Sequence, residues 1–188
     1  MKQKAQALIN SARWVEETHG KAALDDVVRR CSPPVRQRLA ENMAIDWHPF
    51  DELMEFFDVC EQRLGTGDGR VAEEMGAFGA RANLRGVFLK IAQYLAKPEF
   101  LMRRVAGLWR QFNDEGELRV LHFEDRNVQL EMVGLPTPHR WLCASLNGWM
   151  VEVSRAVGLV SPTVRHSQCR AQGDARCIWE IRAVPSGR

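Results

Sequence analysis

The chain has 188 residues, of which 45% are hydrophobic and 27% are charged, and its net charge is +2. These values are typical of a globular domain and exclude collagen-like, disordered and coiled-coil chains. A net charge this small provides no strong field to attract DNA, RNA or an anionic membrane. We therefore expect no nucleic-acid partner and no membrane partner.

The longest uncharged run, residues 141–151, is about half of the roughly 20 apolar residues that a membrane-spanning helix requires. The first twenty residues contain neither a continuous apolar segment nor the cleavage site of a signal peptide. We expect a cytoplasmic protein, in which the five cysteines are thiols or metal ligands rather than a disulfide framework.

Apolar residues recur at helical spacing through most of the first 112 residues. The spacing predicts helices over residues 5–15, 24–31, 49–64, 87–95 and 98–109, and a further helix capped by Asp68. Pro33 and Pro34 are expected to end the second of these, because proline cannot continue a helix. Gly76 and Gly79 lie inside the helix after Asp68, where each costs about 1 kcal/mol relative to alanine, so we expect another helix to approach closely there.

After residues 113–116 the apolar period changes from 3.6 to two. Two alternating runs flank residues 124–127 and predict a hairpin, in which His122 lies on the apolar face and is expected to be buried. A helix over residues 139–157 follows, and two more alternating runs, residues 164–171 and 175–184, predict a second hairpin.

These elements predict a single α+β domain over residues 1–188. In this fold class a helical N-terminal part, residues 1–112, packs on a four-stranded antiparallel sheet. The sheet is made of two hairpins separated by a helix, all within residues 113–188.

Cys169 and Cys177 lie on the two strands of the second hairpin. If residues 172–174 form its loop, the two cysteines face each other with Cβ atoms about 4.5–5.5 Å apart, close enough to share a metal ion. His139 and Cys143, at positions i and i+4 of the preceding helix, provide two more ligands. We therefore predict a structural zinc site of Cys169, Cys177, Cys143 and His139, which fastens the helix to the hairpin.

Two other interpretations of the hairpin cysteines remain open. They can be small buried hydrophobic residues, or they can form a redox disulfide, which a reducing cytosol disfavours. His166 is three residues before Cys169 and so lies on the opposite face of a regular strand, at the surface or in a pocket wall.

Four tryptophans, Trp109, Trp141, Trp149 and Trp179, fall in or beside the part expected to pack on the sheet. They form the core, or they line a small-molecule cavity between the sheet and the helices, and the sequence leaves both open. The nucleotide-binding, hydrolase and metalloprotease motifs are absent, so we expect a protein that is not an enzyme.

The segment from Cys169 to Glu180, with two cysteines around a Gly-Asp turn and an aromatic strand, resembles the C-terminal signature of the 4-vinyl reductase domain family. A wider set of segments resembles a family of single-domain proteins abundant in myxobacteria. It comprises Trp47-His48-Pro49, Pro98-Glu99-Phe100, Leu108-Trp109-Arg110 and residues 139–149.

The resemblance implies a fold shared with heme nitric-oxide-binding domains, Bet3-like vesicle-tethering subunits and the aromatic-sensing domains of bacterial transcription activators, often as a dimer. For the aromatic sensors it implies a zinc ion held by two hairpin cysteines, an upstream cysteine and a glutamate. Cys169 and Cys177 match the hairpin pair and Cys143 approximately matches the upstream cysteine, whereas His139 stands in place of the acidic ligand.

The same resemblance does not lead us to predict a heme. Heme nitric-oxide-binding domains have a Tyr-x-Ser-x-Arg motif and a helical proximal histidine. Residues 109–113 do not match that motif, and residues 87–113 contain no histidine.

We therefore expect a cytoplasmic sensory or ligand-binding domain for a small hydrophobic or aromatic molecule, which signals to a partner protein. The alternative is a protein–protein interaction module, an adaptor or homodimer without a ligand. A closed core without a cavity would favour this alternative.

Overall fold

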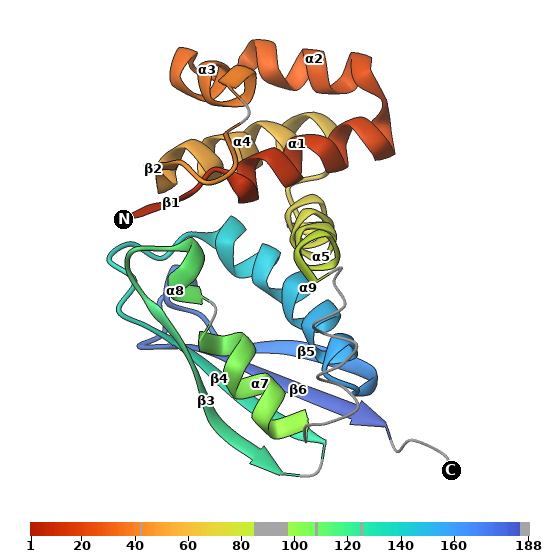
Figure 1. The fold of residues 1–188 in the computed structure, drawn as a ribbon, viewed down its shortest axis with the longest axis vertical. Coiled ribbons are helices and arrows are strands. Elements are labelled where there is room, and N and C mark those ends of the chain that lie inside the picture. Colours follow the sequence, from red (N-terminus) through yellow and green to blue (C-terminus); the bar gives the residue numbers. More distant parts are fainter. Residues whose placement is uncertain (42, 85–97, 108, 125, 185–188) are drawn as a thin grey trace.

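The structure, a computed structural model, describes residues 1–41, 43–84, 98–107, 109–124 and 126–184 (Figure 1). Its N-terminal half is helical. The helices are α1 (Gln6–His19), α2 (Lys21–Arg30), α3 (Pro33–Glu41), α4 (Phe50–Leu64), α5 (Arg70–Leu84), α7 (Pro98–Gly107) and α8 (Trp109–Phe112). A small antiparallel sheet joins β1 (Lys2–Lys4) to β2 (Trp47–Pro49).

The helix boundaries agree with the sequence at α4 and α5 and differ at α3. The Asp68 carboxylate accepts a hydrogen bond from the Arg70 backbone N–H at 3.1 Å, as expected of a cap. Helix α3 is not among the predicted helices, because the pattern predicts only a helix end at Pro33 and Pro34. Proline also fits the first turn of a helix, where the missing N–H costs nothing. The helix expected over residues 87–95 lies outside the described residues.

The C-terminal half confirms the predicted sheet. Strands β3 (Glu117–Glu124) and β4 (Asn127–Val133) form one hairpin, and β5 (Val160–Gln168) and β6 (Cys177–Val184) form the other. Helix α9 (Arg140–Ala156) connects the two hairpins. The four strands are antiparallel in the order β3-β4-β6-β5, so the fold is the predicted α+β class.

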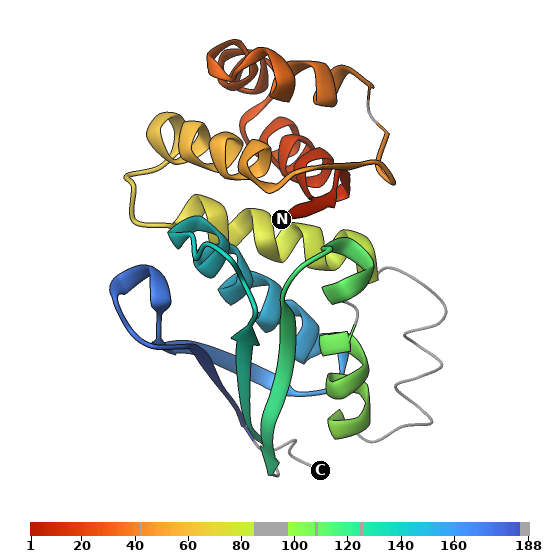
Figure 2. The ribbon, with the colours of Figure 1, turned by 90° about the vertical axis from the view of Figure 1, so that its left-hand side faces the viewer.

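The elements form a stack of layers (Figure 2). Helices α1 to α4 form the end distant from the sheet, α5 and α9 lie in the middle, and the sheet lies at the other end, with α7 packed on β3. Inward-facing residues of β4 and β6, such as Leu130 and Trp179, belong to the same buried core as Leu146 of α9. Helix α9 therefore connects the sheet to the helical layers.

The middle layer depends on two glycines where α5 and α9 cross. A Cβ atom added at Gly76 would lie 1.9 Å from the backbone oxygen of Ser145, and one added at Gly148 would lie 1.9 Å from that of Glu73. The expected close helix approach is confirmed at Gly76. At Gly79 the nearest atom would be 4.0 Å from an added Cβ, so no close approach explains that glycine.

Register shifts in the sheet change which residues face the core, and two of them lie beside histidines. The pairing of β3 with β4 shifts between Val120 and His122, and that of β5 with β6 shifts between His166 and Gln168. The His122 side chain is 56% exposed and lies 3.3 Å from Glu124. The expectation that His122 is buried is therefore wrong, because a bulge inserts one residue and reverses the alternation beyond it.

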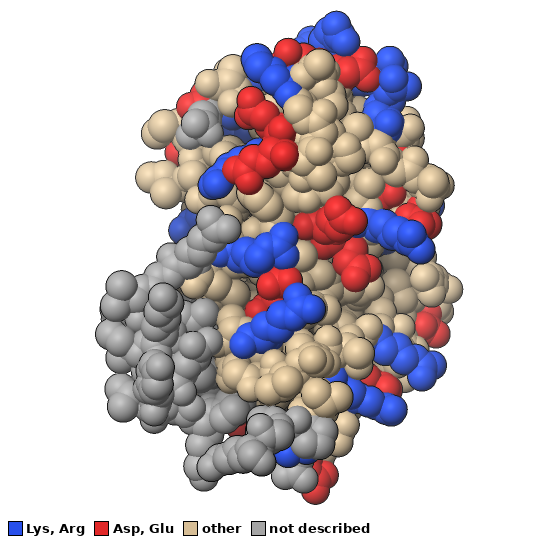
Figure 3. Space-filling view, turned by 90° about the vertical axis from the view of Figure 1, so that its right-hand side faces the viewer, with Lys and Arg blue, Asp and Glu red and all other residues tan. Residues whose placement is uncertain are grey.

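None of the helices in the described part of the chain has the length and hydrophobicity needed to cross a membrane. On the face shown in Figure 3, lysine and arginine side chains are interspersed with aspartate and glutamate. The described surface on this side has no continuous basic patch of the kind that binds nucleic acid.

Candidate metal centre and ligand cavity

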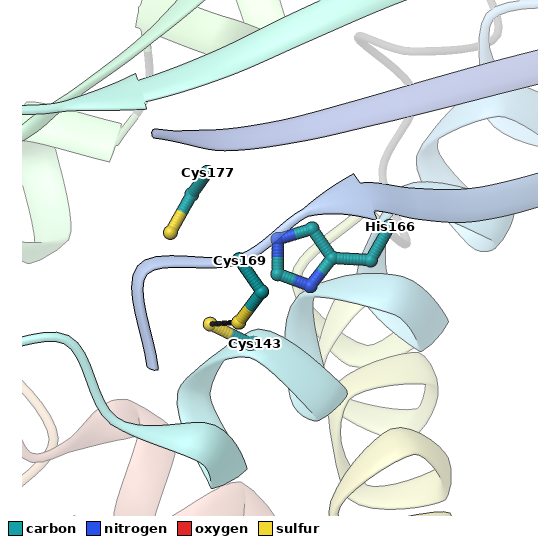
Figure 4. Close-up of side chains that lie close together, drawn as sticks. All are labelled: Cys143, His166, Cys169 and Cys177. Carbon is teal, nitrogen blue, oxygen red and sulfur yellow. Dashed lines mark hydrogen bonds between the residues drawn. The ribbon is translucent and has the colours of Figure 1, made fainter. Parts of the chain in front are cut away.

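Four side chains that can ligate a metal converge where α9 meets the second hairpin (Figure 4). They are Cys143, His166, Cys169 and Cys177, and their ligand atoms all lie within 4.8 Å of one another. The three cysteines are buried and the histidine is half-buried. Three of the four residues predicted as ligands are thus together.

The hairpin loop holds Cys169 and Cys177 in place. The Asp174 carboxylate accepts a hydrogen bond from the Cys169 backbone N–H at 2.6 Å, and the Asp174 N–H donates to the Cys169 carbonyl at 3.1 Å. Gly173 has a φ of 101°, a conformation that other residues rarely adopt. The Gly-Asp turn seen in the sequence therefore brings the end of β5 back to the start of β6.

His166 joins the cluster because of the bulge in β5. On the N-terminal side of the bulge His166 pairs with Trp179, and on its C-terminal side Gln168 pairs with Ile178. The extra residue places His166 and Cys169 on the same side, although an odd spacing of three puts them on opposite faces of a regular strand. No signal in the sequence marks this bulge, so the histidine was missed.

The His166 ring is fixed by stacking on Trp179, with ring centroids 4.0 Å apart and an angle of 2° between the planes. Its Nε2 atom is buried and has no hydrogen-bond partner among the described residues. A buried nitrogen without a partner is costly, and coordination to a metal ion would remove that cost.

His139 lies outside the cluster. It is the N-terminal cap of α9, and its Nδ1 atom accepts a hydrogen bond from the Trp141 backbone N–H at 3.3 Å. Burial lowers the pKa of His139, which favours the neutral ring that this acceptor role requires. The structure thus gives His139 a role in starting the helix and places His166, not His139, beside the three cysteines.

The sulfur atoms are spaced for a shared ion rather than for a disulfide. The Sγ atoms of Cys143 and Cys169 are 3.7 Å apart, far longer than the roughly 2.05 Å of an S–S bond, and all five cysteines are free. Two sulfur ligands at 2.3 Å from one tetrahedral ion are about 3.8 Å apart. This pair therefore has the edge length of a tetrahedral site.

Hydrogen bonds favour the thiolate form of Cys177. The Cys143 thiol makes the largest contribution to the lowered pKa of Cys177, followed by the neighbouring His166 ring. The Arg170 backbone N–H, which lies 3.4 Å from Cys177 Sγ, lowers this pKa further. The hydrogen bond to Cys177, together with burial, raises the pKa of Cys143. Because the thiolate is the form that binds metals, the cluster already favours one ligand in its binding state.

A second feature is a cavity of about 310 Å³ among the helical layers. Apolar and aromatic side chains provide most of its wall, including Phe57, Phe112, Leu146, Trp109 and Trp149. No described residue of β3, β4, β5 or β6 lines it, so the expectation of a cavity between sheet and helices is wrong about its position. Trp141 and Trp179 are core residues.

Comparison with protein-family models finds no match, and none of the curated proteins is similar to the chain in sequence. The fold is similar to those of solved H-NOX proteins over nearly the whole chain. An H-NOX protein from S. oneidensis in the Fe(II) ligation state has a TM-score of 0.72 at 12% identity, covering 98% of each chain. One from K. algicida in the Fe(II) unliganded state has a TM-score of 0.69 at 9% identity, also covering 98% of each chain.

An H-NOX from Shewanella woodyi, bound to IWP-051 in the Fe(II)CO state, has a TM-score of 0.69 at 11% identity and covers 98% of this chain and 96% of its own. At these identities the similarity establishes only the fold. This fold agrees with the sequence resemblance, which implies a fold shared with heme nitric-oxide-binding domains.

The structural neighbours correct one expectation. Heme was not predicted for this chain, yet the solved structures that share its fold are H-NOX proteins in Fe(II), Fe(II)NO and Fe(II)CO states. The expectation that excludes a heme is therefore corrected, because the chain shares its fold with these iron-containing proteins.

The side chains that line the cavity show whether it could hold a heme through an iron ligand. Heme iron is held by histidine, cysteine, methionine or tyrosine. Among the described lining residues only Met75, which is 2% exposed, is of one of these types. The described lining does not fit a heme held through histidine, cysteine or tyrosine, and we derive no step through a heme.

Proposed function

We propose that the protein is a sensory domain that binds a small hydrophobic or aromatic molecule in the cavity between α1, α5, α8 and α9. The observation that supports this proposal is the cavity itself, since an interaction module without a ligand would have a closed core at this position. A ligand-binding domain without catalytic residues acts by changing its contacts with another protein, so the proposal includes a partner protein.

The size and lining of the cavity suit a single aromatic ring with substituents. An apolar cavity of about 150 Å³ in another protein is sufficient to bind benzene. The volume here is about 310 Å³. Aromatic walls favour flat apolar ligands, because ring pairs in offset or edge-to-face contact add to the energy of burial.

The proposal also includes a metal ion, with zinc as the metal that the donor set suits best. Three thiols and one imidazole form a common ligand set of structural zinc sites. The ion would connect Cys143 on α9 with both strands of the second hairpin, and the resemblance to the aromatic sensors implies the same role for the hairpin cysteines. Because α9 also lines the cavity through Leu142 and Leu146, the ion would hold one wall of the ligand site in position.

The ligand proposal is tested by filling the cavity. Ala7 lines the cavity, whereas Ala22 is exposed on α2. We expect wild-type protein and the control variant Ala22→Phe to bind toluene or benzyl alcohol, and Ala7→Phe to lose detectable binding because its ring occupies the space. Binding is followed by chemical-shift changes in NMR spectra, and thermal unfolding verifies that each variant is folded.

The absorption spectrum of the purified protein is recorded before any ligand is added. An intense Soret band would show that heme occupies the protein and would contradict the proposed aromatic ligand. Equal binding by Ala7→Phe and wild-type protein would show that the aromatic molecules bind outside the cavity, which also contradicts the proposal.

A further inference from the structure

The cavity has one buried polar atom in its wall without a partner. Gln3 on β1 is 4% exposed, and its Nε2 atom has no hydrogen-bond partner among the described residues. Of the buried side-chain atoms without a partner in the described chain, this one alone belongs to a residue that lines the cavity. A buried amide donor without an acceptor is costly, so an oxygen atom of a ligand would be stabilised there.

The other buried amide and hydroxyl groups of the wall are paired within the protein, whereas Asn83 and Gln111 are exposed. Asn10 Nδ2 donates to Asn83 Oδ1 at 3.2 Å, Ser11 donates to the Ala7 carbonyl at 2.8 Å, and Ser145 donates to the Leu142 carbonyl at 3.0 Å. Asn113 Nδ2 donates to the Trp109 carbonyl at 3.2 Å. Gln3 is therefore the polar side chain of the wall that most requires a partner from a ligand.

Lys4, the next residue of β1, supplies the one charged side chain among the described residues of the wall. Its Nζ atom lies 5.9 Å from the ring centroid of Phe112 and 5.7 Å from that of Trp47. No carboxylate lies within ion-pair distance of it in the described residues. The cation is held by aromatic rings and retains its capacity to pair with an anion.

We infer that the cavity selects small aromatic carboxylates. The aromatic ring occupies the apolar part of the cavity, the carboxylate accepts a hydrogen bond from Gln3 Nε2, and the positive charge of Lys4 in the wall attracts it. This inference rests on the proposed function, because it names the class of ligand for the same cavity. Charge-assisted hydrogen bonds are about twice as strong as neutral ones, so the Gln3 amide, with the Lys4 charge in the same wall, favours a carboxylate over an uncharged group.

Benzoate, benzyl alcohol and toluene are suitable probes, because they share one ring and differ in the polar group. Their affinities are measured by isothermal titration calorimetry and NMR at pH 7, where benzoate is ionised. We expect wild-type protein to bind benzoate about tenfold or more tightly than benzyl alcohol, and Lys4→Met to lose that advantage while it binds toluene as wild-type protein does. Lys2→Met, an exposed position on the same strand, is the matched control and should bind benzoate normally.

Gln3→Leu separates recognition from a structural role. Because the amide donor has no partner in the described protein, its removal should leave the midpoint of thermal unfolding unchanged or raise it, while benzoate affinity falls. Equal loss of benzoate binding in Lys2→Met and Lys4→Met would show a general charge effect and overturn the inference. Binding of toluene and benzyl alcohol without preferred binding of benzoate would also overturn it and leave the proposed function intact, whereas a wild-type protein that binds none of the three would contradict the proposed function itself.

Discussion

Replacing Gly76 with alanine is expected to destabilise the protein by about 3 kcal/mol or more, and Gly148→Ala is expected to have a similar effect. At each position the new methyl group would lie 1.9 Å from a backbone oxygen of the opposite helix. A backbone oxygen inside a helix cannot move away as a flexible side chain can, so α5 and α9 would have to separate. Their separation would open the central layer, and the loss of packing extends beyond one methyl group.

Gly79→Ala is the matched control, because Gly79 lies in the same helix with its nearest neighbour 4.0 Å from an added Cβ. We expect this variant to be as stable as wild-type protein or up to about 1 kcal/mol more stable, since alanine favours the helix. Urea denaturation with circular dichroism measures all three free energies of unfolding. If Gly76→Ala and Gly79→Ala had equal stability, α5 and α9 would not be in the close contact described here.

The fold could be predicted from the sequence where period and turn signals agree. Helix α4 has an apolar stripe between a proline and a glycine-rich break, and both hairpins have alternating strands around polar turns. Helix α3 could not be predicted in the same way, because its proline pair fits both the end of one helix and the first turn of the next.

The candidate metal site could be predicted as far as its cysteines. Cys169 and Cys177 are adjacent across a short loop in any register close to the one expected, and Cys143 lies at the start of the helix that packs beside them. His166 depends on one inserted residue in β5, which the sequence does not reveal. The position of the cavity depends on how α1, α5 and α9 cross, and residue patterns within single elements do not determine those distances.

Replacing Cys177 with serine is expected to reduce bound zinc from about one per chain to nearly none. The groups around Cys177 lower its pKa and so favour the thiolate that binds metals, and serine is a poor zinc ligand at neutral pH. Zinc is measured by inductively coupled plasma mass spectrometry on protein purified without a metal-binding tag. Cys60→Ser is the control for cysteine loss in general, because Cys60 is buried on α4 outside the cluster, and it should retain the metal.

Substitutions of the two histidines test which of them is the metal ligand: His166, as the structure indicates, or His139, as the sequence predicts. We expect His166→Ala to weaken zinc binding by more than the roughly 10- to 100-fold that loss of an outer hydrogen-bond partner costs, because it removes a ligand. His139→Ala should retain zinc and lose about 1 kcal/mol of stability, because the α9 cap is lost. Zinc loss in His139→Ala but not in His166→Ala would reverse the assignment of the histidine ligand. Wild-type protein that contains no zinc, and gains none from a zinc-supplemented medium, would contradict the metal site.

A chelator that competes for zinc should lower the unfolding temperature of wild-type and Cys60→Ser protein and leave that of Cys177→Ser unchanged. The reason is that the ion stabilises only the folded state, which assembles its ligands.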